Sequence, residues 1–143
     1  MLEQNRDQTR QVFFSVWQKV LKGLPMESME LIIADIIKRH PEYHSMLDEQ
    51  EKSMANDFSI EQGETNPFLH MGLHIAIREQ IAADRPIGIN QLYKELIKQY
   101  NSEHDVEHAM IDCLAESLWL AQQQQSMPDE LQYMENLRQL KKS

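Results

Sequence analysis

The sequence predicts an all-α fold, and three observations support this prediction. Glycine is scarce, with four residues in 143, and no long alternation of valine, isoleucine and threonine marks a strand. Between proline, glycine and capping residues, apolar side chains recur at the spacing of three and four that places them on one helix face. The length and the 41% of hydrophobic residues suit one core. We therefore expect a single-domain helical bundle of six to seven helices over residues 1–143.

The helices of the first half are expected to begin and end at prolines and glycines. A Gly-Leu-Pro sequence at 23–25 ends the first helix. The second ends at His40, because the residue before a proline avoids α geometry, and Pro41 suits the first turn of the third. The polar stretch 54–66 predicts an internal loop. The expected helices of this half span about 7–22, 27–39 and 41–53.

The second half contains clearer helix starts. Asn66 is expected to cap a helix that has Pro67 at its first position, and Ser102 is expected to cap a later helix. The Asp-Arg-Pro-Ile-Gly sequence at 84–88 predicts a turn, and the Ser-Met-Pro sequence at 126–128 opens a last helix. The expected helices of this half span about 67–84, 89–100, 103–125 and 126–141.

All six histidines fall into pairs spaced four residues apart, where random placement would give roughly a quarter of one such pair. Residues four apart share a helix face, so two imidazoles in this spacing can bind one metal ion. The first pair straddles a helix start, and we expect capping or core packing there. The pairs are His40/His44, His70/His74 and His104/His108.

The second and third histidine pairs are predicted to form one site. Each pair lies in the first two turns of its helix, 67–84 or 103–125, on a face that continues with apolar residues. The links through the intervening helix are short, so neighbouring helices should be antiparallel and these two parallel. If they pack together, four imidazoles meet at one end of the bundle. Nitrogen ligands suit a divalent transition metal, and zinc, iron, nickel and copper all stay open. The predicted metal ligands are His70, His74, His104, His108 and Asp112.

Glu107 is the candidate catalytic residue. It completes a His-x-x-Glu-His sequence, the arrangement of inverzincins, in which the glutamate is a general base. The distant glutamate ligand of that class has no clear counterpart, and the carboxylates of a ferritin-like di-iron site are missing from helix 67–84. Asp112 follows His108 by four residues and is a further ligand or an acceptor for an imidazole N–H. Metal-assisted hydrolysis or a redox step would suit such a site, and the sequence leaves open whether the chain is an enzyme.

The alternative is a non-catalytic adaptor that binds another protein, with histidines that are structural groups of the core. In that interpretation Arg78 and Glu116 are expected to pair with each other. A formal net charge of -9 disfavours nucleic acid, and the densest apolar stretch, at 31–37, is too short to cross a membrane. The polar start of the chain and the single cysteine, Cys113, favour a cytoplasmic location. A protein partner or a homo-oligomer stays open.

Long motifs also carry a family resemblance. They are NPFLHMGLHIAIREQ at 66–80, DRPIG at 84–88, the Glu-His pair at 107–108 and CLAESLW at 113–119. With these motifs the chain resembles an uncharacterised, mainly proteobacterial family of small single-domain proteins, catalogued as a domain of unknown function. The resemblance covers nearly the whole chain. It implies no activity, cofactor or partner.

Overall fold

The computed structural model describes residues 2–58 and 66–141, and it confirms the all-α fold for these residues. The contacts divide the chain into two compact units, unit 1 at Met1–Gly72 and unit 2 at Leu73–Ser143. The boundary falls within helix α5, Pro67–Ala83, which begins in unit 1 and ends in unit 2. The single domain expected over 1–143 stays a prediction, and each unit is described by itself.

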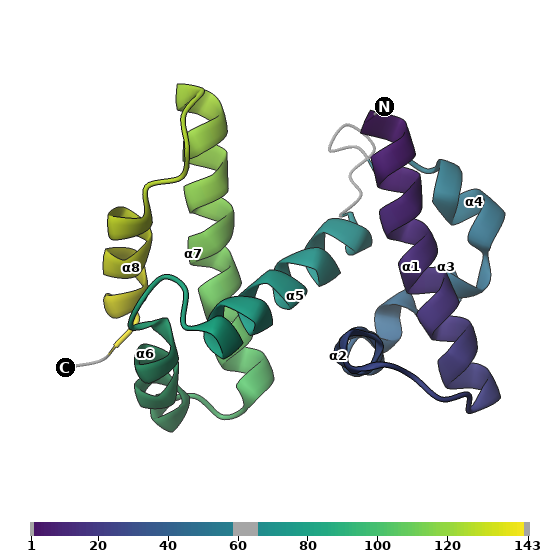
Figure 1. Cartoon of the computed structure of the whole chain (residues 1–143), viewed down its shortest axis with the longest axis horizontal. Coiled ribbons are helices and arrows are strands. Elements are labelled where there is room, and N and C mark those ends of the chain that lie inside the picture. Colours follow the sequence, from purple (N-terminus) through teal and green to yellow (C-terminus); the bar gives the residue numbers. More distant parts are fainter. Residues whose placement is uncertain (1, 59–65, 142–143) are drawn as a thin grey trace. The chain divides into compact units, whose positions relative to one another are not determined.

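Unit 1 packs four helices around an aromatic core (Figure 1). Helix α1 contacts α2, α3 and α4, and its aromatic residues meet Phe68 from the first turn of α5. The helices are α1 (Leu2–Lys22), α2 (Ser28–Lys38), α3 (His44–Asp48) and α4 (Gln50–Ala55), with a 3₁₀ turn η1 at Pro41–Tyr43. The buried apolar residues of this core include Phe13, Phe14, Val16, Trp17, Ile33, Ile36, Ile37, Leu47 and Phe68.

The single helix expected at 41–53 is wrong, because this segment forms η1, α3 and α4 in succession. Glu49 interrupts it with φ −112° and ψ 67°, outside the helical region. The end of α4 is capped by Arg10, which donates to the carbonyl oxygens of Ser53, Met54 and Asn56 at 3.0, 3.1 and 2.6 Å. Helix α4 thus runs into the expected loop at 54–66, most of which lies outside the described residues.

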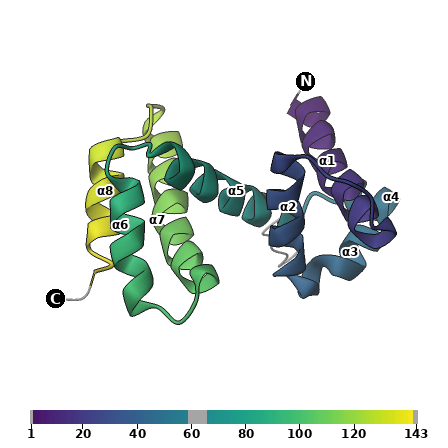
Figure 2. The same cartoon turned by 60° about the horizontal axis from the view of Figure 1, so that its bottom comes forward.

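Unit 2 contains the second part of α5 and three further helices (Figure 2). Helix α8 packs along both α6 and α7. The further helices are α6 (Ile89–Leu96), extended by the 3₁₀ turn η3 at Ile97–Gln99, then α7 (Glu103–Gln124) and α8 (Glu130–Arg138). Their core is formed by Ile77, Ile89, Leu92, Leu96, Val106, Met110, Ile111, Cys113, Leu114, Tyr133, Met134 and Leu137.

The capping residues explain where these helices begin. Asn66 accepts hydrogen bonds from the backbone N–H of Phe68 and Leu69, and Ser102 accepts from that of Asp105, as predicted. The last helix begins at Glu130 rather than near 126, because Asp129 is its N-cap and accepts from Gln132. No helix in the described part of the chain combines the length and the apolar character that crossing a membrane requires.

The predicted parallel alignment of the histidine-bearing helices is wrong. Figures 1 and 2 both show α5 crossing α7 at a steep angle. The turn between α5 and α6 is fixed by Asp84, whose carboxylate accepts from the backbone N–H of Gly88 and Asn90. Short links make consecutive helices neighbours, but side-chain packing sets their crossing angle. The crossing brings the second part of α5 against the first turns of α7.

Candidate metal centre

Three of the predicted ligands come together in unit 2, at the crossing of α5 and α7. His74 lies on α5, and His104 and His108 lie on the first two turns of α7. Each offers one ring nitrogen, and these nitrogens lie within 4.8 Å of one another. His74 is fully buried, whereas the two histidines of α7 are partly exposed. We call these three residues the histidine cluster.

The ring geometry suits a shared ion. Nε2 of His74 lies 3.3 Å from Nε2 of His108. Two nitrogens that bind one tetrahedral zinc at about 2.0–2.1 Å stand about 3.3 Å from each other. The ring centroids of His104 and His108 are 4.1 Å apart, and those of His74 and His104 are 5.3 Å apart with nearly parallel planes. The same Nε2–Nε2 distance also fits a hydrogen bond between two neutral imidazoles, which is the contact that the adaptor alternative requires.

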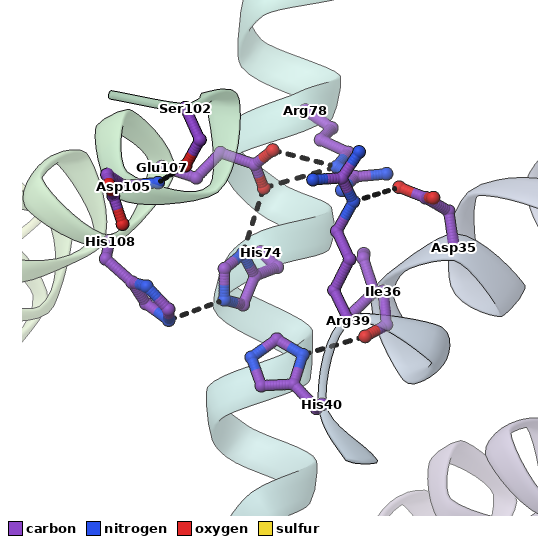
Figure 3. Close-up of polar contacts among 10 residues, drawn as sticks. All are labelled: Asp35, Ile36, Arg39, His40, His74, Arg78, Ser102, Asp105, Glu107 and His108. Carbon is purple, nitrogen blue, oxygen red and sulfur yellow. Dashed lines mark hydrogen bonds and ion pairs between the residues drawn. The ribbon is translucent and has the colours of Figure 1, made fainter. Parts of the chain in front are cut away.

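Glu107 lies behind His74, on the side away from His108 (Figure 3). Its Oε1 is 2.9 Å from Nδ1 of His74, and its side chain is almost completely buried. Nε of Arg78 donates to both carboxylate oxygens at 3.2 Å each. An ionised carboxylate only accepts hydrogen bonds, so Nδ1 of His74 is the donor in this contact, and in the neutral ring Nε2 is then the atom that carries the lone pair.

The electrostatics keep Glu107 ionised. Burial alone would raise the pKa of its carboxyl group, since it removes water from the charge. The hydrogen bond from His74 and the charge and hydrogen bond of Arg78 outweigh this effect, and the pKa of Glu107 is lowered. A carboxylate with a lowered pKa and two occupied oxygens is a weak base.

The comparison with family models matches residues 5–139 to the family described as Domain of unknown function (DUF1841). The chain belongs to this family. The match covers both units and confirms the resemblance seen in the sequence motifs. No curated protein and no solved structure matches the chain.

The two other predicted ligands of this DUF1841 chain have different surroundings. His70 lies on α5 in unit 1, where its ring packs edge-on against His40 and near Tyr43, with centroids 5.1 and 6.3 Å apart. Asp112 lies on α7, one turn beyond His108, and is exposed to solvent. Membership of the site stays a prediction for both residues.

The first histidine pair makes capping contacts of the kind that its position predicts. Nδ1 of His40 lies 2.7 Å from the carbonyl oxygen of Ile36, and Nε2 of His44 lies 2.8 Å from that of Ile37. A neutral imidazole N–H can donate to such a carbonyl, so these rings cap the C-terminal end of α2. The ring of His44 also packs on that of Trp17, with centroids 4.5 Å apart.

Sequence reasoning missed the partner of Glu107. The expected pair of Arg78 with Glu116 is wrong, because Arg78 bonds Glu107 while Glu116 is exposed. A signal was available in the sequence, since Arg78 follows His74 by four residues and shares its helix face. Only the crossing of α5 over the first turns of α7 shows which carboxylate it meets.

Proposed function

We propose that the chain binds one divalent transition metal ion through ring nitrogens of His74, His104 and His108. The observation that carries this proposal is the convergence of three imidazoles from two helices, with two Nε2 atoms at the spacing of ligands on one ion. Two of them share a helix face at i and i+4, which makes their relative positions rigid.

The surroundings of the histidine cluster support the proposal. Only a neutral imidazole can offer a lone pair to a metal. His104 and His108 lie in the first two turns of α7, where the positive end of the helix dipole disfavours imidazolium. The hydrogen bond from Nδ1 of His74 to the carboxylate of Glu107 leaves Nε2 facing His108, and a carboxylate in this position is common next to zinc-bound histidines.

The donor set points to particular metals. Three imidazoles suit zinc, copper, nickel and iron, whereas magnesium and calcium prefer oxygen ligands. For a fixed set of nitrogen ligands, affinity rises from iron through nickel to copper and is lower again for zinc. We expect this order in a titration of the protein.

A reaction at the bound ion is the second part of the proposal. The ion would act as a Lewis acid in hydrolysis or as an electron carrier in a redox step. Glu107 was the predicted general base, but its contacts support an orienting role more strongly, because His74 and Arg78 already occupy its oxygens. Asp112, exposed one turn beyond His108, stays the second candidate for moving protons.

The test compares histidines inside and outside the cluster. Protein purified without a polyhistidine tag is stripped with a chelator, dialysed against Zn²⁺, Cu²⁺, Ni²⁺ or anaerobic Fe²⁺, and its metal content is measured. We expect one ion per chain in the wild type and none in the double variant His104→Ala/His108→Ala. The matched control is His44→Ala, because His44 serves α2 in unit 1 and should leave the metal content unchanged.

A wild type that binds none of the four metals would overturn the proposal. The histidine cluster would then be a hydrogen-bonded part of the core, as the adaptor alternative requires. Circular dichroism of each variant checks that lost binding is not lost folding. Metal content that is equal in the wild type, the double variant and the control would also contradict the assignment.

A further inference from the structure

Arg78 is the charged residue of α5 that contacts Glu107 next to the candidate site. It lies one turn after His74, and 19% of its side-chain surface is exposed. Its Nε reaches both oxygens of Glu107 at equal distance, so the guanidinium faces the edge of the carboxylate. The chain of contacts therefore runs from Arg78 through Glu107 to Nδ1 of His74.

We infer that Arg78 is a positioning residue, which holds Glu107 in the orientation that keeps the proton of His74 on Nδ1 and presents Nε2 to the metal. This role in metal binding rests on the proposed function. It adds a residue that is not itself a proposed ligand, and it assigns that residue a measurable effect on a ring two contacts away.

The geometry explains why Glu107 needs such a partner. Its carboxylate must reach from α7 across to α5, and the last torsion of a glutamate side chain has no sharp preference. The single hydrogen bond from His74 engages Oε1 alone. The contact of Arg78 Nε with both oxygens adds a second anchor for the carboxylate, and it also compensates a charge that is buried away from water.

If Arg78 acted on the metal through its charge alone, its removal would strengthen metal binding instead of weakening it. A guanidinium near a divalent cation repels it, so removal of the charge alone should tighten metal binding. Positioning predicts weaker binding. Lysine keeps the charge but lacks the planar guanidinium, so it is expected to restore the charge without restoring the orientation. The variants Arg78→Gln and Arg78→Lys therefore separate the two roles.

The decisive measurement is the tautomer of His74 in metal-free protein. Long-range ¹H–¹⁵N spectra of histidine-labelled protein distinguish a ring protonated on Nδ1 from one protonated on Nε2. We expect the Nδ1–H form for His74 in the wild type, assigned with His74→Gln, and a mixture of both forms in Arg78→Gln and Arg78→Lys. Arg85→Gln is the matched control, because this arginine is exposed in the turn that follows α5.

The metal affinity is measured on the same samples by competition with a zinc chelator. Loss of an orienting partner behind a metal-bound histidine typically weakens binding by about 10–100-fold, and we expect this loss in both Arg78 variants. A His74 tautomer that is unchanged in both variants overturns the inference, as does tighter zinc binding by Arg78→Gln. If the tautomer depends on Arg78 while the wild type binds no metal, the positioning role is supported and the proposed function alone fails.

Discussion

Tyr133 makes a polar contact inside the apolar core of unit 2. Its hydroxyl donates to Oε1 of Gln80 at 2.7 Å, which joins α8 to α5, and only 3% of the residue is exposed. Burial raises the pKa of this phenol strongly, and the neighbouring Cys113 thiol raises it further against the smaller lowering effect of Gln80. The folded protein therefore holds this proton more tightly than the unfolded chain does.

The sign of this shift predicts a loss of stability in alkali. In the unfolded chain a tyrosine ionises near pH 10, whereas in the folded protein Tyr133 keeps its proton to higher pH. The stabilisation that the buried, neutral phenol of Tyr133 gives to the folded state is complete below about pH 10. It disappears as the pH rises from there towards the pKa of the folded state. Urea denaturation from pH 8.5 to 11 should show a steeper fall for the wild type than for Tyr133→Phe.

The same variant has an effect at pH 8.5, where the phenol is protonated in both states. Loss of the hydrogen bond to Gln80 should cost about 1 kcal/mol of unfolding free energy. Tyr100→Phe is the control, because Tyr100 packs only partly against the core. Parallel pH profiles for the wild type and Tyr133→Phe would contradict this account.

The candidate site shows which residues a sequence can predict. The spacing of four identified His104 and His108 as neighbours, because helix periodicity is local. It could not show that Glu107 faces Arg78, or that His74 lies between Glu107 and His108, since these contacts join residues about 30 positions apart. The role of Glu107 changes for this reason, from a predicted base to an orienting carboxylate.

At the scale of elements, the start of α7 connects helix capping to the histidine cluster. Ser102 accepts from the backbone N–H of Asp105 at 3.2 Å and begins the two turns that carry His104 and His108. The first backbone N–H groups of a helix have no acceptor within the helix, and at the start of α7 the Ser102 side chain accepts from one of them. A frayed first turn would separate the two rings.

We predict that Ser102→Ala lowers the free energy of unfolding by about 1 kcal/mol, the usual cost of losing a serine cap. Zinc affinity should fall as well, because part of the binding free energy must then be used to order the first turn of α7. Urea denaturation and zinc competition measure both effects. Ser126→Ala is the control, since Ser126 is exposed beyond the end of α7. Equal stability of the two variants would contradict the role of the cap.

The predicted element boundaries were correct where a cap or a proline acts locally. The starts of α5 and α7 follow from Asn66 and Ser102. The end of α4 and the late start of α8 could not be predicted in this way. Arg10 closes α4 from more than 40 residues away, and Asp129 acts as the cap in a stretch where Ser126 offered an equally good signal. A distant side chain sets the first of these boundaries, and a choice between two local caps sets the second.

At the scale of the whole molecule, composition and helical periodicity were enough to predict the all-α fold, but not its division. The boundary of the two units at Gly72 and Leu73 lies inside the continuous helix α5. No linker rich in proline, glycine or serine marks it, and a helix does not change its periodicity where its contacts change. The three residues of the histidine cluster, His74, His104 and His108, all belong to unit 2.

The most direct test of the metal site is the X-ray absorption fine structure of the zinc-loaded, tag-free protein. This measurement counts imidazole ligands through their characteristic outer-shell scattering. We predict at least three imidazole nitrogens at about 2.0–2.1 Å from the ion, and one fewer in His108→Ala. A shell with fewer than three imidazoles in the wild type, or one made of oxygen alone, would contradict metal binding by His74, His104 and His108.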